Sequence, residues 1–356
     1  MIQKIVFVGL HYLFFSAFVV ASWGGGSLAL KRALNSHKSR SWLEHALAIT
    51  AGMALFICFL QWLAIAGQLR VIWIAAFAGA GILAAMLQLR EYGFAPIQDF
   101  CLSWKSLTPN EKRGLLVVLL FVAATLLRPL GPPMEWDEVM YHLPHAKQWA
   151  LTGHLGIHEW LRYPWFPYNY DLLYSGALLV SDDVLPHLIH ACAGWLVAII
   201  LYQLGKQHAN HTVACVATII WLFLSRRDFD NAYIDMGVTL FVFASCAAFH
   251  LWLENRSKPV WLAAAAFFMG IAIGSKYQAL SFLPVFAVVL LIYERRPRFL
   301  LLTVVCLLVP CIYWYARNVI LTGDPFNPVG GRIFGFTDWN LADYKAQFQD
   351  LKNHTG

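Results

Sequence analysis

Long apolar segments are the feature that most constrains how this chain of 356 residues can fold. Segments of roughly 16 to 22 mostly apolar residues recur along it, and a helix needs about that length to cross a bilayer. A soluble domain of this size could not bury so much apolar surface, because 59% of its residues are hydrophobic and only 13% are charged. The sequence therefore predicts an all-α, polytopic membrane protein with about ten transmembrane helices.

The expected spans divide the chain into three parts. Residues 1–113 hold three extra N-terminal spans and a cytoplasmic loop, residues 114–320 form a transmembrane module, and residues 321–356 begin a further extracytoplasmic segment. The first outside loop of the module covers residues 131–183. The spans are expected at residues 6–20, 42–66, 71–89, 115–129, 184–204, 212–224, 236–253, 260–273, 279–293 and 299–320.

Glycines and cysteines are assigned structural roles. The run Gly24-Gly25-Gly26 is interpreted as a flexible exit from the first span. The seven cysteines include no CxxC pair, and all but Cys101 lie inside apolar runs. We therefore expect small core residues and neither a disulfide framework nor a metal site.

Basic residues indicate the orientation. If every span crosses the membrane, nearly all basic loops lie on one side, which the positive-inside rule makes cytoplasmic. Arg226 and Arg227 are the exception. The first span could instead be a signal peptide, but its removal would invert every later loop, so we expect an anchor. The net charge of +6 comes from these short loops and does not indicate nucleic-acid binding. The basic residues of the loops expected to be cytoplasmic are Lys31, Arg32, Lys38, Arg40, Arg90, Lys105, Lys112, Arg113, Lys206, Arg256, Lys258, Arg295, Arg296 and Arg298.

The first outside loop begins with a predicted amphipathic helix. Pro132 and Pro133 end the preceding span, and Asp137 can cap a new helix with Glu138 in its first turn. Gly153 is expected to end it. The helix is expected to lie flat on the membrane with its polar face in water. The apolar face carries Val139, Leu143, Ala146 and Ala150, and the polar face carries Asp137, Tyr141, His145 and Gln148. The alternative is that both acids are only helix-start charges.

The remainder of the loop is rich in aromatic and ionisable residues. His154, His158 and Arg162 precede an aromatic run at residues 163–171. Such a density beside a bilayer is typical of a surface that binds sugars and lipid headgroups. The alternative is an aromatic belt at the membrane interface.

Three more ionisable residues lie near the outer ends of spans. Asp235 precedes the seventh span, Lys276 lies in a break between the eighth and ninth, and Arg317 lies near the end of the tenth. Ionisable residues at such positions are functional candidates, and snorkelling is the alternative for the lysine and the arginine.

Residues 115–328 resemble the GT-C superfamily of membrane glycosyltransferases, in its branch similar to aminoarabinose transferase and protein O-mannosyltransferase. The resemblance rests on the order, spacing and sidedness of several motifs. They are Asp137-Glu138, Tyr141-His142, Thr152-Gly153-His154-Leu155, Arg162-Tyr163-Pro164, Asp235 before a span, Gly270 to Lys276, and Tyr313-Trp314-Tyr315. In two positions this chain departs from the branch: Met140 stands for a frequent arginine, and Tyr163 for a lysine. Further helices usual in the branch are missing, so we expect an unusually short chain or a fragment.

The resemblance implies an inverting transfer of a sugar from a polyprenyl-phosphate donor to a hydroxyl acceptor. The active site would lie on the extracytoplasmic face, in the plasma (inner) membrane. Asp137 is the candidate base, and Glu138 is a second catalytic candidate. Lys276, Arg317 and Arg162 would stabilise the leaving phosphate. The other expected substrate-binding residues are Tyr141, His142, Tyr163 and Asp235.

Metal dependence stays open at this stage. Glu138 and Asp235 could orient groups or hold a divalent cation, and no other cofactor is implied. His142 with His145, and His154 with His158, have spacings that could ligate zinc, although interfacial or substrate contacts are favoured. The rival functions are a transporter or flippase of lipid-linked sugars, and a non-catalytic scaffold.

Overall fold

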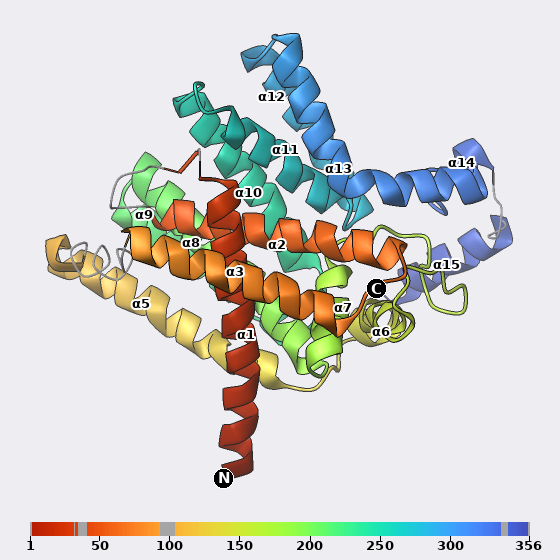
Figure 1. Ribbon diagram of the computed structural model, residues 1–356, viewed down its shortest axis with the longest axis horizontal. Helices are drawn as coiled ribbons and strands as arrows, with labels where there is room; N and C mark the ends of the chain where they lie inside the picture. Colours follow the sequence, from red (N-terminus) through yellow and green to blue (C-terminus); the bar gives the residue numbers. More distant parts are fainter. Residues whose placement is uncertain (1, 32, 35–40, 93–103, 336–340, 355–356) are drawn as a thin grey trace.

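The computed structural model describes residues 2–31, 33–34, 41–92, 104–335 and 341–354. Within these ranges the chain is helical, with short 3-10 and π turns and no strand (Figure 1). The helices are α1 Ile2–Ala29, α2 Trp42–Ile65, α3 Val71–Tyr92, α5 Pro109–Leu126, α6 Leu143–Thr152, α7 Asp171–Val180, α8 Val184–His208, α9 His211–Leu224, α10 Asp235–Glu254, α11 Pro259–Ile273, α12 Leu283–Tyr293, α13 Pro297–Thr322, α14 Gly331–Phe334 and α15 Leu341–His354.

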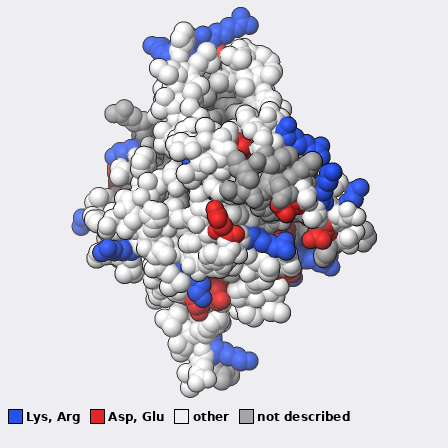
Figure 2. Space-filling view, turned by 90° about the vertical axis from the view of Figure 1, so that its right-hand side faces the viewer, with Lys and Arg blue, Asp and Glu red and all other residues white. Residues whose placement is uncertain are grey.

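The predicted all-α membrane fold is confirmed. Seven helices in the described ranges are long and apolar enough to cross a bilayer: α1, α2, α3, α5, α8, α10 and α13. Three other expected spans correspond to shorter apolar helices, namely α9, α11 and the segment Tyr277–Tyr293. On the face shown in Figure 2, acidic and basic side chains are scattered over a larger surface of other residues and are most dense toward the right.

Two helices begin with reciprocal caps that the sequence encodes locally. The Ser41 hydroxyl accepts a hydrogen bond from the Glu44 N–H at 3.2 Å, and the Glu44 carboxylate accepts one from the Ser41 N–H at 2.9 Å. Thr108 and Glu111 form the same arrangement at the start of α5. Each cap satisfies backbone donors that the first helical turn would otherwise leave unpaired.

Glycines allow α1 to pack closely on its neighbours. α1 crosses α2 and α3 steeply, and its N-terminal end extends beyond the other helices (Figure 1). A Cβ on Gly24 would lie 2.0 Å from the Gly81 carbonyl oxygen, and one on Gly26 would lie 1.8 Å from the Ala48 carbonyl oxygen. These residues lie inside α1, so the expectation of a flexible exit was wrong. Small residues at a crossing let two backbones approach within van der Waals contact.

The loops gather at the two ends of the bundle. At one end, Lys258 donates to the Ala33 carbonyl at 2.7 Å, and His211 donates to the Glu111 carbonyl at 2.8 Å. At the opposite end the Leu69 N–H donates to the Gly153 carbonyl at 3.1 Å. Arg32, Lys38, Arg40 and Cys101 lie outside the described residues. Which end faces the cytoplasm remains a prediction.

Candidate active site

The loop between α5 and α7 is folded into the protein and is not a flat surface helix. A π turn, Glu138–His142, leads directly into α6, which ends at Gly153 in the left-handed conformation as predicted. Tyr141 and His145, expected to face water, are 7% and 1% exposed. The expected polar face was therefore wrong, because these side chains pack against the aromatic run that follows α6.

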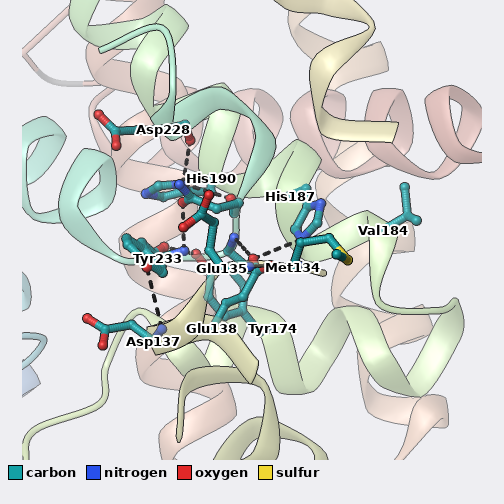
Figure 3. A network of polar contacts seen from close by, with 12 residues as sticks. Met134, Glu135, Asp137, Glu138, Tyr174, Val184, His187, His190, Asp228 and Tyr233 are labelled. Atoms are coloured by element: carbon teal, nitrogen blue, oxygen red, sulfur yellow. Dashed lines mark hydrogen bonds and ion pairs between the residues drawn. The ribbon is translucent and has the colours of Figure 1, made fainter. Parts of the chain in front are cut away.

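The two neighbouring acids of the loop have different environments. Asp137 is half-buried and itself helical, and its side chain makes no capping hydrogen bond, so the cap predicted for it was wrong. Glu138 is fully buried. Figure 3 shows the Asp137 carboxylate pointing away from the polar cluster around Glu138. The first acid is therefore accessible and the second is not.

Glu138 joins three segments of the chain. One carboxylate oxygen accepts hydrogen bonds from the N–H groups of Met134 and Glu135, the latter at 2.9 Å. The other accepts from His187 Nε2 at 3.1 Å and from the Ala232 N–H at 2.6 Å (Figure 3). Burial opposes the charge on Glu138, but hydrogen bonds from His187, Ala232 and Glu135 outweigh it and lower its pKa. Glu138 is thus a charged anchor for the loop.

His190 fixes the segment that leads into α10. Its Nε2 accepts the Met236 N–H at 3.1 Å, so Nδ1 carries the proton and donates to the Asn231 and Asp228 carbonyls at 3.0 and 3.1 Å. This places Asp235, the first residue of α10, at the same end of the bundle as the loop.

Two tyrosines contact Asp137, and an ion pair joins Asp235 to Lys276. Lys276 Nζ contacts Asp235 Oδ1 at 2.7 Å, with side-chain exposures of 24% and 54%. The Asp137 N–H donates to the Tyr233 hydroxyl at 3.4 Å. Burial, and then the neighbouring Asp137 carboxylate, raise the pKa of Tyr141, which hydrogen bonds to that carboxylate. The structure thus pairs Asp137 with Tyr141 and Asp235 with Lys276.

His142 forms a buried pair with a residue that sequence reasoning missed. Its Nδ1 donates to Asp171 Oδ1 at 2.7 Å, and the two residues are 2% and 0% exposed. Asp171 is the last residue of the aromatic run at residues 163–171. No local sequence pattern indicated that it pairs with His142, 29 residues away.

Arg317 is committed to the backbone of the aromatic run. This buried guanidinium donates to the carbonyls of Trp165 and Phe166 at 2.7 and 3.4 Å and to the Asn318 side chain at 2.9 Å. Arg162, by contrast, is exposed and lies over the Trp136 ring at 4.9 Å from its centroid. Of the two arginines, Arg162 is the one that a ligand could reach.

Asn169 is a second residue that the sequence did not single out. It is fully buried, and its amide donates to the Pro310 carbonyl at 2.8 Å. Its Oδ1 accepts from Trp314 Nε1 at 2.7 Å and Gln61 Nε2 at 3.1 Å, while its N–H donates to the Gly274 carbonyl at 2.8 Å. A Cβ on Gly274 would lie 2.2 Å from the Asn169 amide nitrogen. Asn169 therefore ties the loop to α2, α13 and the break that carries Lys276.

Metal ligands do not converge in the part of the chain that the structure describes: no group of three or more His, Cys, Asp or Glu side chains there could hold an ion. Glu138 is surrounded by N–H donors, and Asp235 is paired with Lys276. His145 donates to a backbone carbonyl, that of Arg162. These three candidate ligands are thus already engaged within the protein.

Fold and site together define a helical membrane protein with Asp137, Glu138 and the Asp235–Lys276 ion pair at one end of the bundle. Residues 175–314 match the family described as dolichyl-phosphate-mannose-protein mannosyltransferase. This match supports a membrane glycosyltransferase of the GT-C type. It includes Asp235 and Lys276 and begins after Asp137.

Two relatives are uncharacterised proteins of Shigella flexneri. The first is 32% identical over 130 residues, which cover 36% of this chain and 65% of the relative. The second is 46% identical over 43 residues, which cover 12% of this chain and 24% of the relative. The chain therefore spans under two thirds of each relative. No solved structure matches significantly.

Proposed function

We propose that this protein transfers a sugar from a polyprenyl-phosphate donor to a hydroxyl acceptor, with inversion, at the extracytoplasmic face of the plasma (inner) membrane. The observation that carries the proposal is the division between the paired acids. Glu138 is buried and saturated with hydrogen bonds, whereas Asp137 is half-buried and turned away from that network. The family matched by residues 175–314 is named for a lipid-phosphate sugar donor, which supports this class of donor.

Asp137 acts as the base in a single displacement. The acceptor oxygen forms a bond to the anomeric carbon while the bond from that carbon to the phosphate oxygen breaks. The acceptor proton passes to the Asp137 carboxylate, and the bonding electrons leave with the phosphate. A base positioned in this way is needed because a neutral hydroxyl is a poor nucleophile.

Two accessible cations are available for the leaving phosphate. Lys276 is held by Asp235 at 2.7 Å, which orients its ammonium group and leaves its other N–H donors for a ligand. Arg162 is exposed beside Trp136. Arg317 contributes indirectly, because its hydrogen bonds to Trp165 and Phe166 position the aromatic run. The negative charge that develops on the phosphate is stabilised by such fixed cations.

This arrangement favours an enzyme over a transporter. The ion pair, Asp137 and Arg162 lie around the loop at one end of the bundle. A transport path would place its binding groups near the bilayer midplane. A scaffold would tolerate loss of the Asp137 charge, and the experiment below distinguishes it from an enzyme.

The test measures transfer from a panel of radiolabelled polyprenyl-phosphate sugars in membranes that carry wild type, Asp137→Asn or Asp183→Asn at matched expression. Asp183 is an exposed acid at the start of α8 whose side chain makes no capping hydrogen bond, so it controls for the lost charge. Asp137→Asn should lower transfer by about 100-fold or more, and Asp183→Asn by less than about twofold. Equal transfer by both variants would exclude Asp137 as the base. Absence of transfer by the wild type across the panel would contradict the proposed function.

A further inference from the structure

The backbone at Tyr163 is strained. Among the described residues, Tyr163 is the one non-glycine residue with positive φ, at 57°. A side chain with a Cβ is unfavourable in this left-handed region, and an aromatic one is uncommon there. Pro164 follows, and a proline favours an extended conformation in the residue before it. Glycine or asparagine would fit this backbone better than tyrosine.

Buried donors hold the strained segment in place from within the protein. The carbonyls of Arg162, Tyr163 and Trp165 all accept hydrogen bonds from side chains that are at most 9% exposed. A strained conformation persists when its surroundings fix it in this way, and such positions concentrate at ligand sites. His145 donates to the Arg162 carbonyl at 2.8 Å, and Tyr168 donates to the Tyr163 carbonyl at 2.8 Å. Arg317 and Asn318 donate to the Trp165 carbonyl at 2.7 and 3.0 Å.

The strain places an aromatic stack beside the candidate base. The Tyr163 ring lies parallel to Phe166, with centroids 4.8 Å apart and an interplanar angle of 12°. It meets Tyr141 edge to face at 4.9 Å, and Tyr141 in turn contacts the Asp137 carboxylate. Both rings of the stack are only partly buried. Each ring packs against the core and still leaves part of its aromatic surface accessible.

We propose that the stacked rings of Tyr163 and Phe166 bind a sugar ring of the acceptor, so that the acceptor hydroxyl belongs to a carbohydrate. The inference rests on the proposed function for the role of Asp137. The base must touch the molecule that gives up its proton, and Tyr141 contacts both Asp137 and the stack. Partly exposed aromatic surface beside polar groups suits a saccharide, which presents C–H groups on its faces and hydroxyls at its edge.

The test separates the ring from the backbone by comparing two variants. Tyr163→Asn suits the left-handed backbone but removes the ring, whereas Tyr163→Phe keeps the ring. Each is purified in detergent and measured for binding to an array of immobilised saccharides, for thermal unfolding, and for transfer. Tyr163→Asn should lose at least about tenfold in saccharide affinity with an unchanged or raised unfolding temperature, and Tyr163→Phe should stay within about threefold of wild type.

The outcomes distinguish this inference from the proposed function. Wild-type affinity in Tyr163→Asn would overturn the binding role, and a loss accompanied by a lower unfolding temperature would make Tyr163 a structural residue. A wild type that transfers sugar to peptide or lipid hydroxyls but binds no saccharide would overturn the carbohydrate acceptor and keep the glycosyltransferase. Saccharide binding without transfer would keep the stack as a saccharide-binding surface and overturn the proposed glycosyltransferase.

Discussion

Replacing Glu138 by glutamine tests whether this acid anchors the loop. The carboxylate accepts four hydrogen bonds, two at each oxygen, from Met134, Glu135, His187 and Ala232. Glutamine keeps one oxygen, so two of the donors would face an NH₂ group. Hydrogen bonds to a charged group each contribute about 1.5 to 3 kcal/mol, and buried donors left without an acceptor add a further penalty. We therefore expect Glu138→Gln to lower the free energy of unfolding by about 3 to 5 kcal/mol.

The assay is denaturation of the purified protein in mixed micelles, followed by far-UV circular dichroism. Glu135→Gln is the matched control, because this neighbouring side chain is exposed. It should change the free energy of unfolding by less than about 0.5 kcal/mol. A loss below about 1 kcal/mol for Glu138→Gln would refute the anchoring role. Glu138 would then return as a candidate for direct contact with substrate.

Two further predictions concern packing and pH. Gly26→Ala should destabilise the protein by about 1 to 3 kcal/mol or more in the same assay, because its Cβ would lie 1.8 Å from the Ala48 carbonyl oxygen. Gly25→Ala is the control: a Cβ there meets nothing within 4 Å, so it should be neutral or stabilising, and equal effects would contradict the helix crossing. Burial lowers the pKa of His145 from 6.5 to about 4, so the stability from its neutral form is complete above pH 6.5 and is lost as the pH falls toward 4. Unfolding at about pH 5 should show a loss of about 2 kcal/mol that His145→Gln lacks, and parallel pH profiles would contradict it.

The sequence alone determined the class of fold. A segment that spans a bilayer satisfies its backbone hydrogen bonds internally by forming a helix. Composition and segment length therefore predicted the all-α membrane protein. Turn residues were also readable, since Gly153 ends α6 as expected. The sequence of a long apolar segment does not indicate the angle at which its helix crosses neighbouring helices, however. The run Gly24-Gly25-Gly26 was therefore interpreted as flexible, although Gly24 and Gly26 are packing residues.

The sequence also predicted several polar residues near the site, but tertiary structure decided what each one contacts. Asp235 and Lys276 were each expected near the outer end of a span, but their ion pair at 2.7 Å, across 41 positions, was not predicted. Asp137 and Glu138 are neighbours in the sequence, and nothing local reveals that one is accessible and the other buried. The partners of Glu138 lie as far as 94 residues away, and those of Asn169 as far as 145. Burial and pairing across such separations depend on how the helices pack, and local sequence patterns do not specify that packing.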